Sequence, residues 1–118
     1  MKSGGKWNSR KGRINVEVRA SRLGSDWCLL VTGGDLPHVG AVGWCGRDVQ
    51  PVSLDFPEHR DRAVVDLFLA ALFQVPGHHV VVAGIHLDRI TRVEIDEVLE
   101  LCRTLANRVA VALARDSA

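Results

Sequence analysis

The sequence predicts an α+β domain in which a mainly antiparallel sheet is covered on one side by helices. In the first half of the chain, short apolar segments are separated by polar or glycine-containing turns, as in strands joined by hairpins. In the second half, two long segments carry apolar residues at helical spacing, and a β-branched run lies between them. The expected order of elements is therefore β-β-β-(β)-α-β-α, with a short fourth strand.

Four strands are expected before the first helix. The first alternates apolar and polar residues, which is typical of a half-buried strand. The second is more completely apolar, and the third contains Gly40 and Gly43, which mark close backbone approach. Pro51 confines the fourth to a sheet edge or a strand start. These segments are residues 13–20, 26–32, 39–45 and 50–55.

Two helices flank one further strand. Residues 61–75 are apolar nearly all round, so this helix is predicted to be buried on most faces, with Asp61 as its N-cap. Residues 79–85 are strongly β-branched and are predicted to form a central strand. Thr91 and Glu94 have the spacing of a capping box, which predicts the start of the last helix.

The composition is that of one ordinary globular domain. The 118 residues are 47% hydrophobic and 25% charged, which excludes a disordered chain. No apolar run approaches the roughly 20 residues that a membrane span needs, so no membrane association is expected. The three cysteines are widely spaced and include no CxxC pair, which disfavours a disulfide framework or a zinc ribbon and favours a cytoplasmic protein.

The basic residues are concentrated at the N-terminus. Residues 1–12 are predicted to form a flexible basic tail, and residues 13–118 a single domain. Of the 15 Lys and Arg residues, five lie in the first 13 positions. The rest of the chain therefore has 10 basic and 14 acidic residues, a net charge near −4. Because a nucleic-acid-binding domain concentrates positive charge on its folded body, nucleic acid is not an expected partner. The five bases are Lys2, Lys6, Arg10, Lys11 and Arg13.

Three polar clusters at the ends of predicted elements are candidate functional residues. Each contains a His and an Asp: Asp35 with His38, His59 with Asp61, and His86 with Asp88. Singly, each has an ordinary structural interpretation, namely a hairpin turn, a helix N-cap, or a histidine bound to a loop carbonyl. If they converge, they would form a site suited to a phosphate or a divalent metal.

The chemistry expected of such a site follows from its groups. Gly33 and Gly34 would let backbone N–H groups approach a ligand, and Arg60 would add a guanidinium beside a helix N-terminus. The imidazoles supply nitrogen ligands for a metal. Hydrolytic machinery is not predicted, because the sequence has no P-loop, G-x-S-x-G, H-E-x-x-H or G-x-G-x-x-G motif.

The segments that carry these clusters resemble a known family. TGGDLPHVGAV at 32–42, PEHRD at 57–61 and AGIHLDRITRVEI at 83–95 are similar to the small D accessory subunits of gallate and hydroxyarylic-acid decarboxylases, the LpdD-like prenylated-flavin chaperones. The resemblance covers roughly residues 14–109. It implies the fold of proteasome-assembly-chaperone domains, an antiparallel sheet packed by helices.

The resemblance implies a non-catalytic protein that carries prenylated flavin mononucleotide (FMN) from a flavin prenyltransferase to a UbiD-like aromatic acid decarboxylase. The family pattern has Gly-His-Lys where this chain has Glu58-His59-Arg60, so Glu58 adds a Cβ and a negative charge at the expected phosphate site. The ligand-side residues would be Gly33, Gly34, Asp35, His38, His59, Arg60, His86 and Asp88.

Further expectations concern the ring, a metal and association. Trp44 is predicted to stack on the flavin ring, with a place in the core as the alternative. His38, His59 and His86 are the expected ligands of a divalent metal that bridges the phosphate. Two other functions stay open: an assembly subunit of the decarboxylase that binds no cofactor, and a small metal-dependent enzyme. A homodimer formed through an edge strand is also expected.

Overall fold

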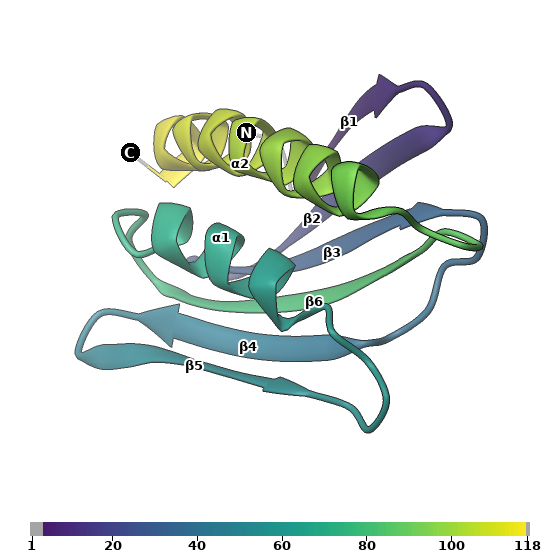
Figure 1. The fold of residues 1–118 in the computed structure, drawn as a ribbon. Coiled ribbons are helices and arrows are strands. Elements are labelled where there is room, and N and C mark those ends of the chain that lie inside the picture. The colour runs from purple at the N-terminus through teal and green to yellow at the C-terminus, as the bar shows by residue number, and fades with distance from the viewer. Residues whose placement is uncertain (1–3, 118) are drawn as a thin grey trace.

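A computed structural model describes residues 4–117 and contains one six-stranded sheet and two helices (Figure 1). The strand order is β1-β2-β3-β6-β4-β5, and only β3 and β6 are parallel neighbours. The α+β class and the expected order of elements are confirmed. The strands are β1 (Gly4–Lys11), β2 (Ile14–Leu23), β3 (Asp26–Gly34), β4 (Ala41–Gly46), β5 (Val49–Asp55) and β6 (His78–His86). The helices are α1 (Arg62–Leu72) and α2 (Arg92–Ser117).

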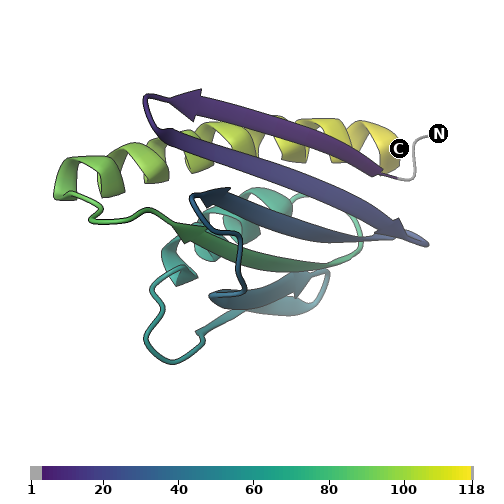
Figure 2. The ribbon, with the colours of Figure 1, turned by 90° about the vertical axis from the view of Figure 1, so that its right-hand side faces the viewer.

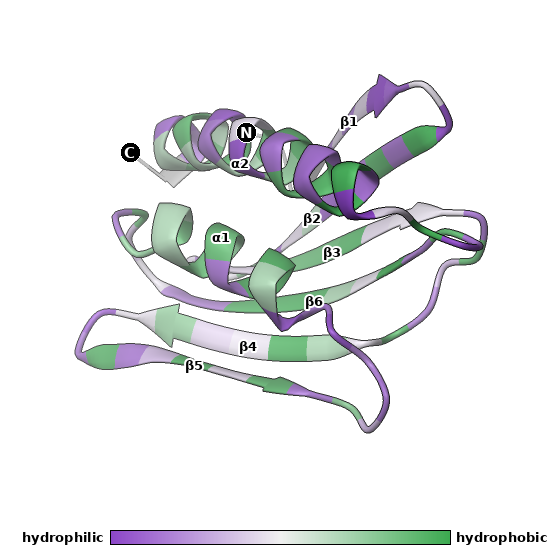
Figure 3. Cartoon of the chain, viewed as in Figure 1, coloured by the Kyte–Doolittle hydropathy of each residue, from purple (hydrophilic) through white to green (hydrophobic). Residues whose placement is uncertain are grey.

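Both helices lie on the same face of the sheet (Figures 1 and 2). Helix α1 packs over β4, β5 and β6, and α2 packs over β1 and β2 and against α1. Most residues of α1 and of the central strands β3 and β6 are hydrophobic, whereas polar and apolar residues alternate along α2 (Figure 3). Neither helix is apolar enough over the length needed to cross a membrane, within residues 4–117.

The core lies between the helices and the sheet. Every second residue of β2 and β3 points into it, as the strand period requires. One stripe of α2 faces it at helical spacing. The inward residues of β2 and β3 include Val16, Val18, Trp27, Leu29 and Val31, and the stripe comprises Val98, Cys102, Leu105, Val109 and Leu113.

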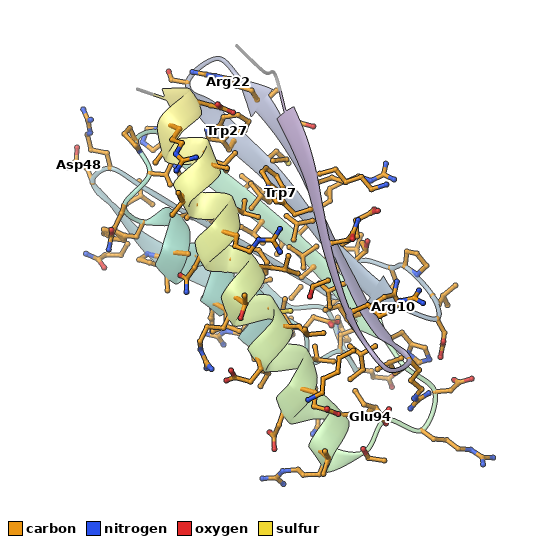
Figure 4. All side chains as sticks on the ribbon, turned by 90° about the horizontal axis from the view of Figure 1, so that it is seen from above. Trp7, Arg10, Arg22, Trp27, Asp48 and Glu94 are labelled. Atoms are coloured by element: carbon orange, nitrogen blue, oxygen red, sulfur yellow. The ribbon has the colours of Figure 1, made fainter. Side chains whose placement is uncertain are left out.

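The predicted flexible tail is wrong for residues 4–11, which form β1. This strand pairs with β2 along its whole length, from Gly4↔Ser21 to Lys11↔Ile14. Trp7 is half-buried against the core, between β1 and α2 (Figure 4). Two bases of β1 form ion pairs, Lys6 with Glu17 at 3.0 Å and Lys11 with Glu97 at 2.8 Å. Residues 1–3 lie outside the described part of the chain.

Helix α1 is shorter and less buried than predicted. It ends at Leu72, and Val64 and Phe68 face the core whereas Ala63 and Ala70 are exposed. The apolar character all round this segment therefore does not correspond to burial on most faces. The predicted edge position of the strand with Pro51 is confirmed, because β5 is the last strand of the sheet.

The capping box at the start of α2 is confirmed. The Thr91 N–H donates to Glu94 Oε1 at 3.0 Å, and the Glu94 N–H donates to Thr91 Oγ1 at 3.1 Å. Arg13, from the turn between β1 and β2, also donates to both Glu94 carboxylate oxygens at 2.6 and 2.8 Å. The hydrogen bonds that Arg13 and the Thr91 backbone N–H donate to Glu94 lower the pKa of Glu94 to about 2.

The lowered pKa predicts how acid affects the start of α2. Because the pKa of Glu94 lies below its ordinary value of 4.5, the ion pair stabilises the fold above pH 4.5. That contribution is lost as the pH falls through about 2. We expect Arg13→Ala to raise the pKa of Glu94 toward 4.5, as measured by an NMR titration of its carboxyl carbon. Arg108→Ala, an exposed arginine further along α2, is the control. Identical titrations in wild type and Arg13→Ala would contradict this role of Arg13.

Candidate functional site

The parallel pairing of β3 and β6 assembles the site. Because the two strands run in the same direction, their carboxyl ends meet at one edge, where Gly34 lies opposite His86. The loop after β3, the segment that precedes α1 and the start of α2 lie at the same end of the sheet (Figure 1). The three polar clusters of the sequence lie in or beside these segments.

The structure brings the three candidate histidines together. The ring centroid of His38 lies 5.0 Å from that of His59 and 6.2 Å from that of His86. The Nδ1 atom of His59 lies 2.8 Å from the Pro57 carbonyl oxygen. Since a carbonyl only accepts, Nδ1 carries the proton, and in the neutral ring Nε2 is an acceptor.

His38 has acceptors at both ring nitrogens. Its Nδ1 lies 3.1 Å from the Leu36 carbonyl oxygen, and its Nε2 lies 3.3 Å from Asp61 Oδ2. Both contacts are hydrogen bonds only when both nitrogens carry protons. The surroundings of His38 therefore accommodate an imidazolium. His86 has a similar contact on one side, with its Nε2 3.3 Å from Asp88 Oδ1.

Asp61 is buried at the start of α1 and holds these elements together. Its Oδ1 accepts the backbone N–H of Ile85 in β6 at 3.0 Å, while Oδ2 faces His38. Asp61 is the N-cap residue of α1, as predicted, but its carboxylate makes no capping bond. Asp55 Oδ1 instead accepts the Arg62 N–H at 2.8 Å. The buried Asp61 carboxylate thus belongs to the site rather than to the helix cap.

Gly40 leaves the space that Asp61 occupies. A Cβ at position 40 would lie 1.8 Å from Asp61 Oδ2, well inside contact distance. The Gly40 N–H donates to the Ala83 carbonyl at 2.8 Å, so the backbone there is held against β6. The expectation that this glycine marks a close approach is confirmed. The approaching group is a side-chain carboxylate.

The residues Gly34, Asp35 and Asp88 connect the ends of β3 and β6. Gly34 has φ +75, and a Cβ there would lie 1.8 Å from the His86 carbonyl oxygen, so glycine is required. The Asp35 N–H donates to that oxygen at 2.6 Å, and Asp35 Oδ2 accepts the Asp88 N–H at 3.1 Å. Gly33 is buried in β3. These contacts hold the loops in place; these four residues are not among those that line the cavity described next.

A cavity of about 500 Å³ lies between the histidines and the two helices. This size is within the range of small-molecule sites. Its polar end is formed by His38, Glu58, His59, Arg60, Asp61 and His86. The rest of the wall is mostly aliphatic and comes from β6, the loop that follows it and the two helices, with Val64, Ile85, Leu87, Ile90, Ile95, Val98 and Leu99. This wall was not predicted from the sequence, in which its only signal is the two isoleucines, Ile90 and Ile95, beside the capping box.

Glu58 lines this cavity in a left-handed backbone conformation, with φ +66. Residues that carry a side chain rarely adopt that conformation, whereas glycine does so without strain. A glycine here, which the resemblance implies for the family, would adopt this backbone without strain. In this chain the position carries a carboxylate that faces the polar end of the cavity.

Trp44 does not belong to this cavity. It lies on β4 between Gly43 and Cys45, which point toward the helices, so its own side chain points to the opposite face. There it pairs with Val80 and is 39% exposed. Trp44 therefore lies apart from the three histidines, and the alternative of a core position is wrong.

The predicted metal centre has no support in the described residues. Within residues 4–117, no group of three or more His, Cys, Asp or Glu side chains is arranged to hold a metal ion. A zinc site, for example, needs imidazole nitrogens about 2.1 Å from one point. The three rings lie close together without such a common point.

The geometry is that of a small α+β binding domain, with a cavity lined by polar side chains and by an aliphatic wall. The chain belongs to the prenylated flavin chaperone LpdD-like family, whose model matches residues 10–114. It is also 28% identical to Protein LpdD of Lactiplantibacillus plantarum over 93 aligned residues. The aligned region covers 74% of this chain and 68% of that protein. The resemblance found in the sequence is confirmed. The family name indicates a non-catalytic protein that handles prenylated flavin.

The close contact of Gly40 with Asp61 yields a prediction. We expect Gly40→Ala to lower the free energy of unfolding by about 1–3 kcal/mol, because the new methyl group overlaps a buried carboxylate. Asp61→Ala should cost about 1–3 kcal/mol as well, since the Ile85 N–H loses its acceptor. The double variant should cost less than the two single changes together, because the overlap is then removed. Urea denaturation measures all three, and strictly additive costs would contradict the contact.

Proposed function

We propose that this chain is a non-catalytic carrier that binds prenylated FMN in the histidine cavity and delivers it to a UbiD-like aromatic acid decarboxylase. The observation that carries the proposal is the convergence of His38, His59 and His86 with Arg60 at one end of a cavity with an aliphatic wall. FMN derivatives combine a dianionic phosphate with a large, mainly apolar ring. The two ends of the cavity match these two parts. Family membership supports the same cargo.

The polar end suits the phosphate. Arg60 offers a planar set of donors, and the imidazole of His59 is oriented by the Pro57 carbonyl. Ala63 and Val64, in the first turn of α1, also line the cavity, and a helix N-terminus favours an anion. Asp61 opposes the anion less than a free carboxylate would, because both of its oxygens have partners. We therefore assign phosphate binding to direct contacts, without a metal.

The aliphatic wall suits the ring. Ile95, Val98 and Leu99 of α2 face the cavity together with Ile85 and Leu87. Burying an apolar ring against such side chains contributes roughly 25 cal/mol per Å² of apolar surface. The same wall limits the access of solvent and dissolved oxygen to a reduced flavin. In this arrangement the ring packs on branched aliphatic side chains rather than on an aromatic one.

Two of the three cysteines are buried and are not expected to act as nucleophiles. Burial raises the pKa of Cys102 to about 12 and also raises the pKa of Cys45. Because the thiolate is the nucleophile, these two groups are unreactive at neutral pH. In the proposal, a flavin prenyltransferase supplies the cargo and the decarboxylase receives it.

The test is retention of the cargo under anaerobic conditions. Purified protein is mixed with reduced prenylated FMN, desalted, and examined for absorbance, and the affinity is obtained by fluorescence titration. We expect retention at one cofactor per chain, unchanged by EDTA. His86→Ala and Arg60→Ala should each weaken binding about 10- to 100-fold, the usual effect of losing a hydrogen bond to a charged group. Both side chains are exposed, so these variants should fold.

Matched controls lie elsewhere on the sheet. His78→Ala and Arg47→Ala remove an exposed histidine and an exposed arginine from residues that do not line this cavity. They should bind the cofactor as wild type does. A colourless protein after desalting would support the assembly-subunit function instead. Wild-type affinity in His86→Ala and Arg60→Ala would exclude this cavity, and turnover of an aromatic acid without the decarboxylase would contradict a non-catalytic role.

Glu58 provides a second prediction. Its carboxylate repels a phosphate in the same cavity, so Glu58→Gln and Glu58→Gly should both bind FMN several-fold more tightly at low salt. Glu58→Gly also relieves the left-handed strain, roughly 1 kcal/mol, but the greater freedom of glycine in the unfolded chain offsets about as much. We therefore expect little change in thermal stability. Weaker binding in Glu58→Gln would show that Glu58 contacts the ligand favourably.

A further inference from the structure

The first turns of α2 form a wall of the cavity but have little apolar packing of their own. Val98 is the first buried residue of this helix, and none of the described residues 92–97 is buried. Ile90 and Ile95 line the cavity and are 38% and 41% exposed. Residues 89–97 are called the α2 arm. Segments with few buried contacts open locally at low cost, so the arm is the part of this wall that can move.

The arm joins the sheet at a fixed residue, Asp88. The Asp88 N–H donates to Asp35 Oδ2 at 3.1 Å, and the Asp88 carbonyl accepts a hydrogen bond from Arg13 Nη2 at 2.8 Å. The next residue, Arg89, has φ +52, a left-handed conformation that is strained for a residue with a side chain. Hinges are formed by a few residues at the ends of elements that absorb changes in φ and ψ. Arg89 has the position of such a hinge.

Two ion pairs from the β1–β2 hairpin hold the arm against the rest of the molecule. Arg13 donates to both carboxylate oxygens of Glu94 at 2.6 and 2.8 Å, and Lys11 Nζ lies 2.8 Å from Glu97 Oε2. Figure 4 shows Glu94 at the first turn of α2, beside the turn that joins β1 and β2. A bidentate guanidinium–carboxylate pair fixes orientation as well as distance. Arg13 thus binds the fixed Asp88 and the arm with one side chain.

We propose that Arg13 is a positioning residue that latches the α2 arm over the cavity and thereby sets how long the bound cargo is retained. The inference rests on the proposed function, in which the cargo is prenylated FMN. While the latch is closed, Ile90 and Ile95 stay against the ring of the cargo. When the pair with Glu94 breaks, the first turn of α2 frays, as helix ends do, and the ring is released.

An ion pair suits a wall that must open repeatedly. Breaking it costs little, because the side chains of Arg13 and Glu94 are 44% and 18% exposed and no core residue has to move. The pKa of Glu94 is about 2, and a guanidinium is always charged, so both partners stay ionised at neutral pH. Salt weakens such a partly exposed pair. The latch therefore responds to ionic strength rather than to pH near neutrality.

The rate of cargo release tests the latch. The full chain is loaded with reduced prenylated FMN, and its release after dilution is followed by anaerobic stopped-flow fluorescence. Arg13→Ala and Glu94→Gln should each release the cargo about three- to fivefold faster, the effect of losing one partly exposed bidentate pair. Glu94→Gln retains the helix cap, because glutamine also serves in a capping box. The double variant should be no faster than either single variant, since both changes remove the same contact.

Matched variants separate the latch from a general effect on folding. Arg13→Lys keeps the charge but not the two parallel hydrogen bonds, so its release rate should be intermediate. Arg103→Ala removes an ion pair with Glu100 further along α2, outside the cavity, and should release the cargo at the wild-type rate. In about 1 M NaCl the difference between wild type and Arg13→Ala should disappear. Wild-type release in Arg13→Ala or Glu94→Gln, or additive effects in the double variant, would overturn the proposal.

Hydrogen exchange of the protein without cargo tests the arm separately. The N–H groups of Glu94 and Ile95 bond to Thr91 within the arm, whereas Leu105 lies in the buried part of α2. The two arm amides should exchange faster than that of Leu105, and faster still in Arg13→Ala. Exchange as slow as that of Leu105 would contradict a movable arm. A wild-type chain that retains no prenylated FMN would overturn the proposed function and the retention role with it, while the exchange result decides separately whether Arg13 holds the arm.

Discussion

The contact between the buried carboxylate of Asp61 and the backbone of β6 organises one end of this molecule. Asp61 joins the start of α1 to the Ile85 N–H and to His38, so three separate segments meet at one side chain. Its burial is possible because its partners satisfy both oxygens and because Gly40 leaves space. The position of His38 beside His59 depends on this arrangement. The arrangement of the cavity therefore depends on one buried carboxylate, that of Asp61, with a hydrogen-bond partner at each oxygen.

The placement of both helices on one face of the sheet gives its two faces different surroundings. On the covered face, the helix ends, the carboxyl end of β6 and the loop after β3 enclose the cavity proposed for prenylated FMN. On the other face, the strands present exposed apolar side chains, among them Leu30, Leu54 and Val80. Alternation along a strand separates the two, because neighbours such as Ala83 and Val82 point to opposite sides.

The N-terminal segment shows how charge can hide a strand. A run of bases without acids resembles a solvated tail, yet the acids that complement it lie on other elements, Glu17 on β2 and Glu94 and Glu97 on α2. Arg13 and Lys11 therefore connect the β1–β2 hairpin to the beginning of α2, next to the aliphatic wall of the cavity. The hairpin contributes to the site indirectly, by holding this helix end in place.

Much of the fold was determined by local patterns in the sequence. The two-residue alternation of β2, the β-branched run of β6 and the Thr91–Glu94 capping box depend on neighbours in the chain, so they could be predicted. The motifs also identified the family and the three histidine clusters. The parallel pairing of β3 with β6, which brings these clusters together, is a long-range choice that no local pattern encodes. The partners of Asp61 and the sheet face of Trp44 were likewise decided by tertiary structure, because a short pattern shows that a side chain alternates or is apolar but not which element covers it.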